Sequence, residues 1–119
     1  MNKKFDLEDR LVDFAILALQ VAEKLPKTYI GRHFGRQLIR SGSSPALNYG
    51  EAQAAESRND FVHKMKICLK ELRETMICLK IISRKPLVLQ NDTDPVLKEC
   101  NELISIFVKS IQTAQNREK

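Results

Sequence analysis

Apolar residues recur at intervals of three and four positions along four long stretches of the chain. In the first stretch they include Leu7, Leu11, Phe14 and Ala18. Residues spaced in this way lie on one face of an α-helix, which has to pack against other helices. No stretch shows the alternating pattern of a β-strand, and 119 residues suffice for one hydrophobic core. We therefore predict an all-α protein in which residues 1–119 form a single up-and-down antiparallel four-helix bundle.

Capping residues and prolines indicate where the helices begin and end. Ser57 is a favourable N-cap for the third helix, and Asp94 followed by Pro95 is a typical start for the fourth. The small side chains of residues 41–44 let a neighbouring helix approach closely. Pro45 follows them and predicts a kink in the second helix, because proline removes a backbone donor and clashes with the preceding turn. The predicted helices cover about residues 7–25, 30–55, 58–84 and 94–114.

The net charge of +5 is concentrated in the middle of the chain. Residues 27–85 hold twelve Lys and Arg residues against five Asp and Glu residues. Several of these cations recur at helical spacing, and such rows can neutralise successive phosphates of RNA or DNA. The low aromatic content of 6% predicts contacts with the nucleic-acid backbone and weak sequence specificity. The candidate nucleic-acid-binding residues are Arg32, Arg36, Arg40, Lys66, Lys70, Arg73, Lys80 and Arg84.

The alternative for these cations is a solvated surface with acidic neighbours. Glu74 lies one helical turn from Lys70, and Asp60 lies one turn from Lys64, so both pairs can form within the third helix. The spacing alone leaves this alternative open.

Polar residues near the apolar stripes indicate a structural network instead of a catalytic site. Acid–base catalysis by carboxylates needs a cleft, a perturbed pair and a partner nucleophile, and the sequence offers no sign of them. We expect Arg40 to pair across helices with Glu71 or Glu74, and Asn48 to bond within the interior. The predicted network consists of Arg40, Asn48, Glu51, Glu71 and Glu74, and we predict that the protein is not an enzyme.

The cysteines and histidines show no metal-binding pattern. Cys68, Cys78 and Cys100 each lie within a helical pattern and form no Cys-x-x-Cys motif, so we interpret them as buried, small apolar residues. His33 and His63 are far apart, and neither has a second ligand one turn further on. We predict neither a metal site nor a cofactor.

The first and fourth helices carry more apolar surface than one core can use. Soluble proteins generally avoid exposing a large apolar patch, so we predict a homo-oligomer. A deeper core is the alternative explanation, and a partner protein could also cover the surface. The candidate interface residues are Ile16, Leu17, Leu97, Ile104 and Val108.

The chain has no long apolar run. Its longest is about six residues, whereas a membrane span needs about 20. The start of the chain is also too acidic for a secretion signal. We therefore expect a cytoplasmic protein with no membrane partner.

An ordered set of small and polar residues runs through the middle of the chain. An Arg-small-small-x-Ser motif is followed by Asn, by Glu-Ala, by Ser-Arg and by a helix that begins with an acidic residue and Phe. In this order the segment resembles the 23S rRNA-intervening sequence proteins, a family of small bacterial four-helix bundles. The residues that carry the resemblance are Arg40, Ser41, Gly42, Ser44, Asn48, Glu51, Ala52, Ser57, Arg58, Asp60 and Phe61.

The resemblance implies a homopentameric ring of bundles with no known enzymatic activity. A more distant similarity, to the accessory protein of diversity-generating retroelements, implies a basic pentameric bundle with a nucleic-acid partner. Our leading hypothesis is a non-enzymatic oligomeric scaffold that binds RNA or DNA backbones through basic faces of the second and third helices. The alternative is a protein–protein adaptor that uses the exposed apolar stripes or the ring opening.

Overall fold

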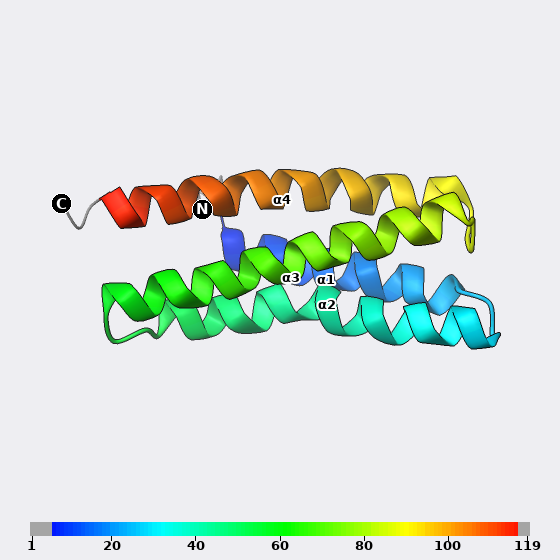
Figure 1. Cartoon of the computed structure of the whole chain (residues 1–119), viewed down its shortest axis with the longest axis horizontal. Helices are drawn as coiled ribbons and strands as arrows, with labels where there is room; N and C mark the ends of the chain where they lie inside the picture. Colours follow the sequence, from blue (N-terminus) through cyan, green and yellow to red (C-terminus); the bar gives the residue numbers. More distant parts are fainter. Residues whose placement is uncertain (1–5, 117–119) are drawn as a thin grey trace.

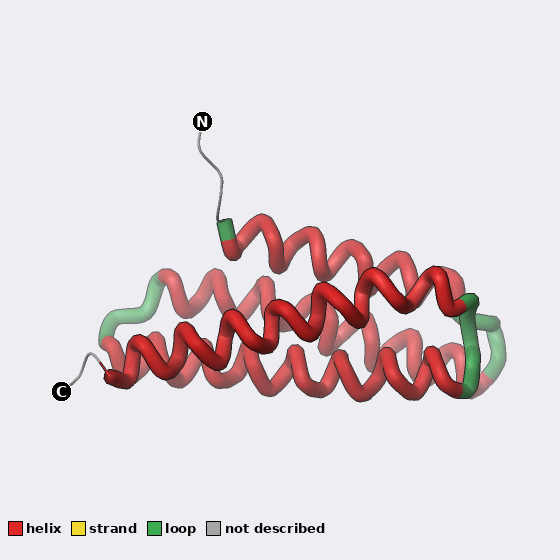
Figure 2. The backbone as a smooth tube through the Cα atoms, turned by 90° about the horizontal axis from the view of Figure 1, so that it is seen from above, coloured by secondary structure: helices red, strands yellow, loops and turns green. Residues whose placement is uncertain are grey.

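Residues 6–116, which the computed structural model describes, form four α-helices and no β-strand. Short loops join consecutive helices, which run antiparallel in a molecule that measures 50 × 31 × 20 Å (Figure 1 and Figure 2). Each helix packs against the next one in the chain, and α1 also contacts α4. The predicted all-α four-helix bundle is confirmed. The helices are α1 Leu7–Lys24, α2 Tyr29–Gln53, α3 Arg58–Arg84 and α4 Gln90–Asn116.

Side-chain caps begin the first three helices. Asp6, Thr28 and Ser57 each accept a hydrogen bond from the backbone N–H three residues further on, at 3.0–3.1 Å. Each cap satisfies one of the donors that a helix leaves unpaired in its first turn. Local polar residues therefore determine where these helices start.

The predicted start of the fourth helix at Asp94 and Pro95 is wrong. The helix α4 begins at Gln90, and Pro95 lies inside it with its ring exposed to solvent. Two contacts hold the extra turn against the bundle. The buried Thr93 hydroxyl donates to the backbone carbonyl of Gln90 at 3.1 Å, and Lys24 of α1 pairs with Asp92 at 2.8 Å. These contacts compensate for the loss of the backbone hydrogen bond that Pro95 cannot donate.

The helix α2 continues through Pro45, and small residues bring α1 close to it. A Cβ atom added to Gly42 would lie 2.6 Å from the Cβ atom of Ala18 in α1. The close approach predicted from the small side chains is therefore confirmed. The carbonyl of the buried Pro45 accepts a hydrogen bond from the Cys68 thiol of α3 at 3.5 Å. The kink expected at this proline stays a prediction.

The core consists of aliphatic residues from all four helices, with Phe14 and Phe107 as its largest side chains. Cys68, Cys78 and Cys100 are buried in it and form no disulfide, which confirms their interpretation as small apolar residues. Burial raises the pKa of the three thiols, to about 12 for Cys68 and Cys100 and about 11 for Cys78. None of the helices in residues 6–116 is long and apolar enough to span a lipid bilayer.

Candidate nucleic-acid interface

The carboxylates in the middle of α3 lie on the side that faces α2. Arg40 of α2 donates from Nη1 to Oε1 of Glu71 at 2.9 Å and from Nη2 to Oε2 of Glu74. The hydrogen bond that Arg40 donates to Glu71 raises the pKa of Arg40, and the negative charges of both carboxylates add to this effect. The Glu71 side chain is only 12% exposed, so Arg40 compensates a carboxylate that has lost most of its water. Arg40 therefore belongs to the contact between α2 and α3.

The other two residues of the predicted polar network make separate contacts. Asn48 donates from Nδ2 to the carbonyl of Ser44 at 3.0 Å and to its Oγ at 2.8 Å, so its hydrogen bonds lie within α2. Glu51 accepts a hydrogen bond from Lys64 of α3 at 2.7 Å. The five residues thus form three local contacts, and the structure does not bring them together as one cluster.

Five of the predicted phosphate-binding residues form a row along the outer face of α3. All five are exposed, and no carboxylate of residues 6–116 lies within ion-pair distance of any of them. Glu74 is one turn from Lys70 but bonds to Arg40 instead. From its first to its last residue the row extends about 27 Å along the helix axis. This α3 cation row consists of Lys66, Lys70, Arg73, Lys80 and Arg84.

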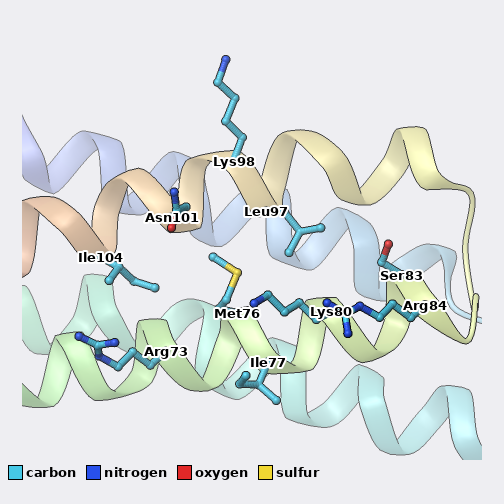
Figure 3. Close-up of a pocket in the computed structure, with 10 residues that line it drawn as sticks. All are labelled: Arg73, Met76, Ile77, Lys80, Ser83, Arg84, Leu97, Lys98, Asn101 and Ile104. Carbon is cyan, nitrogen blue, oxygen red and sulfur yellow. The ribbon is translucent and has the colours of Figure 1, made fainter.

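A groove of about 830 Å³ lies between α3 and α4, beside the α3 cation row (Figure 3). The side chains of Met76, Leu97 and Ile104 point into it and form an apolar floor. The polar residues Ser83 and Asn101 also line it. The groove therefore combines an apolar floor with hydrogen-bonding groups.

Four cations and no carboxylate of the described residues line this groove. Three come from the α3 cation row, and Lys98 of α4 is the fourth. The acidic residues Glu99 and Glu102 of α4 are turned to the opposite side, where both bind Arg10 of α1 at 2.6 Å. Both α3 and α4 thus direct carboxylates to neighbouring helices and leave cations at the groove. The resulting positive field favours an anionic ligand.

Arg32 and Arg36 lie away from the α3 cation row. They line a shallow pocket between α1 and α2 together with Lys27 and Glu23. Arg32 also donates from Nη1 to the backbone carbonyl of Lys27 at 3.1 Å. The eight predicted cations therefore occupy three places: the α1–α2 pocket, the Arg40 ion pairs and the outer face of α3.

The predicted interface residues differ in exposure. Ile16 is 46% exposed and lies on the outer face of α1 with Val12 and Leu19, which are also exposed. The other four are partly buried, and three of them pack against the core. Of the two helices from which the interface was predicted, α1 carries the exposed apolar stripe within residues 6–116, and the interface itself stays a prediction. The partly buried residues are Leu17, Leu97, Ile104 and Val108.

The two histidines are exposed on the surface. His33 packs against the ring of Phe34 at a centroid distance of 5.0 Å, and His63 lines a shallow pocket beside Lys66. The described residues contain no group of three or more His, Cys, Asp or Glu side chains that could hold a metal ion.

Sequence reasoning missed Ser83, Lys98 and Asn101 as groove residues. Leu97 and Ile104 belong to an apolar stripe that the sequence shows on the fourth helix. Asn101 shares that side of the helix, so the same periodicity contained the signal for this residue. Whether this side of α4 lines a groove depends on how α4 is oriented relative to α3, which the sequence does not specify.

Two comparisons with known proteins find similar sequences or structures. A family model described as 23S rRNA-intervening sequence protein matches residues 3–109, while a comparison with curated proteins finds no match. A solved structure from Bacteroides thetaiotaomicron, a protein with unknown function from the S23 ribosomal protein family, is similar with a TM-score of 0.83 and 26% sequence identity. The similarity covers 89% of this chain and 98% of that chain. The chain therefore belongs to the 23S rRNA-intervening sequence protein family.

Proposed function

We propose that this protein is a non-enzymatic helical scaffold that binds the phosphate backbone of RNA or DNA through the α3 cation row. The observation that carries the proposal is the lack of a neighbouring carboxylate for five exposed cations within residues 6–116. Other cations of the bundle are neutralised: Arg10, Lys24 and Arg40 each bond to a carboxylate of another helix.

Unneutralised cations on one helix face repel each other, and an anionic polymer relieves this repulsion. Along the helix axis, Lys66, Lys70 and Arg73 are separated by about 6 Å and about 4.5 Å. Their long side chains can therefore reach successive phosphates of one strand. Binding of this kind releases counterions and weakens steeply with salt.

We also propose that the scaffold is a homo-oligomer, and that it assembles as the pentameric ring implied by the family resemblance. The exposed stripe of Val12, Ile16 and Leu19 on α1 supports self-association, because covering an apolar surface lowers the free energy. Assembly would place several α3 cation rows on one particle. Several weak contacts with one nucleic acid would then act together.

A protein–protein adaptor is the second candidate function. The same α1 stripe supports it, because a partner protein could cover Val12, Ile16 and Leu19 in place of a second copy. A pull-down after nuclease treatment that recovers one protein at fixed stoichiometry would favour this candidate.

The direct test is the binding of purified, nuclease-treated protein to labelled RNA and duplex DNA across a salt series. The test variant combines Lys66→Gln, Lys70→Gln and Arg73→Gln. The control combines Lys27→Gln, Arg32→Gln and Arg36→Gln, which removes the same charge from exposed residues at the α1–α2 side.

We expect the test variant to bind all sequences more weakly, and its salt slope to fall by about 1 for each phosphate that the protein no longer neutralises. The control variant should keep most of the affinity and the slope. An equal decrease of affinity in both variants would show that net charge alone causes binding. No binding by the wild type at low salt would leave the adaptor as the leading candidate.

A further inference from the structure

We infer that the groove between α3 and α4 receives the bases of a single-stranded nucleic acid while the α3 cation row holds its phosphates. The inference rests on the proposed function and specifies the class of nucleic acid that this surface binds. The inference is based on the apolar floor beside the cations, because binding of phosphates alone would leave this floor uncovered.

A duplex would leave the floor of the groove empty. Its bases are stacked and paired inside, so it presents mainly phosphates and sugars to a flat cationic surface. The floor consists of the partly buried Met76, Leu97 and Ile104 (Figure 3). A ligand gains from covering these side chains only if it carries flat, weakly polar groups beside its anionic ones. A single strand meets this condition, because its bases can turn outwards.

The other lining residues suit the edges and faces of bases. The Asn101 amide is both a donor and an acceptor, as is the Ser83 hydroxyl, so each can bond to a base edge. Arg73 and Arg84 have planar guanidinium groups that can stack on a base. The groove volume of about 830 Å³ lies within the range of about 300–1,000 Å³ that small ligand sites occupy. No aromatic residue lines the groove, so preference among the bases should be weak.

An acidic amphipathic helix of a protein would also fit an apolar floor with a cationic edge. The length of the row argues for the extended polymer. The cations beside the groove, from Arg73 to Arg84, span about 16 Å, whereas the row continues to Lys66 and extends about 27 Å. Lys66 lines a separate shallow pocket with His63 and Gln115. Because the cations continue beyond the groove, a nucleic-acid strand that runs along α3 fits the row better than a short protein helix that lies inside the groove.

The test compares three labelled probes at one salt concentration with the full chain: an oligothymidylate, an abasic strand of the same length, and a duplex. The first two carry the same phosphates, so their difference reports the bases alone. We expect the oligothymidylate to bind about tenfold more tightly than the abasic strand. When the measurement is repeated at other salt concentrations, the two probes should show the same salt slope.

A floor variant, Ile104→Ser, has Ile30→Ser on α2 as its control, because Ile30 is exposed and lies outside both the groove and the α1 stripe. The floor variant should bind the oligothymidylate about fivefold more weakly, and its binding to the abasic strand and the duplex should not change. Ile30→Ser should leave all three affinities unchanged. Circular dichroism verifies that both variants are folded, and the comparison of probes on the wild type does not depend on either variant.

Equal binding of oligothymidylate and abasic strand would overturn this inference and leave backbone binding intact. The absence of binding by all probes at low salt would overturn both proposals. An acidic amphipathic peptide that displaces the oligothymidylate and binds more tightly would assign the groove to a protein helix instead.

Discussion

Gly42 of α2 is so close to Ala18 of α1 that a Cβ atom on Gly42 would lie 2.6 Å from the Cβ atom of Ala18. Ala18 is fully buried, and its Cβ atom is attached directly to the helix backbone. It cannot turn away from an added methyl group as a flexible side chain could. The contact between α1 and α2 therefore depends on the missing side chain at residue 42.

Replacing Gly42→Ala should lower the free energy of unfolding by about 1–3 kcal/mol, because an overpacked core forces the two helices apart. Helix propensity alone would act in the opposite direction, by about 1 kcal/mol. Urea unfolding followed by circular dichroism measures the change. Adding Ala18→Gly to the same chain should restore part of the stability.

The control for this prediction is Gly50→Ala in the same helix. Gly50 is exposed, and an added Cβ atom would meet nothing within 4 Å. This variant should gain about 0.5–1 kcal/mol from helix propensity. A Gly42→Ala variant at least as stable as the wild type would contradict the close packing of α1 on α2.

Replacing Arg40→Met should lower the free energy of unfolding by about 1 kcal/mol. The substitution leaves Glu71, which is mostly buried, without its cation. In a double-mutant cycle with Glu71→Gln, we expect a coupling energy of about 0.5–1 kcal/mol. Arg36→Met is the control, because Arg36 is exposed and has no ion pair within the described residues. Unchanged stability in Arg40→Met would show that this ion pair does not stabilise the bundle.

The stability of the bundle should fall as the pH rises above about 9. Burial raises the pKa of the Cys78 thiol from its ordinary value near 9 to about 11, and those of Cys68 and Cys100 to about 12. Between these values the unfolded chain releases thiol protons that the folded chain keeps. Each thiol therefore lowers the free energy of unfolding by up to about 1.4 kcal/mol per pH unit.

Urea unfolding at several pH values from about 8 to about 11 measures this dependence, because these values bracket the ordinary thiol pKa and reach the raised one. The Cys78→Ala variant should show a shallower decline than the wild type, because one titrating group is missing. The native protein should also react slowly with thiol reagents until urea exposes the cysteines. Equal slopes in both proteins, or rapid labelling of the native state, would contradict this prediction.

Replacing Ile16→Glu should dissociate the proposed oligomer. A charge in the centre of an apolar interface is costly to desolvate, so the variant should migrate as a 13.7 kDa monomer. Light scattering after size-exclusion chromatography gives the mass. Ile81→Glu on α3 is the matched control, because Ile81 is 44% exposed and Ile16 is 46% exposed. A monomeric wild type would refute self-association, and dissociation by Ile81→Glu alone would move the interface to α3.

The cationic groove shows the limit of sequence reasoning most clearly. Periodicity assigned Arg40 and Lys70 alike to rows of possible phosphate contacts. Arg40 binds Glu71, 31 positions away in the sequence, as we also predicted for it, whereas Lys70 stays without an ion pair within residues 6–116. The spacing within one helix could not decide which cations become neutralised, because the neutralising carboxylates come from the next helix.

The sequence by itself determined that the chain forms four helices, where the first three begin, and which residues of the first helix face the core. These features depend on local caps and on the three- and four-residue spacing of apolar side chains, which act within one helix. Only the tertiary structure decided that α4 starts at Gln90, and that Met76, Leu97 and Ile104 form one groove beside unpaired cations. Both depend on how each helix is rotated and placed against its neighbours, which the packing of the whole core decides.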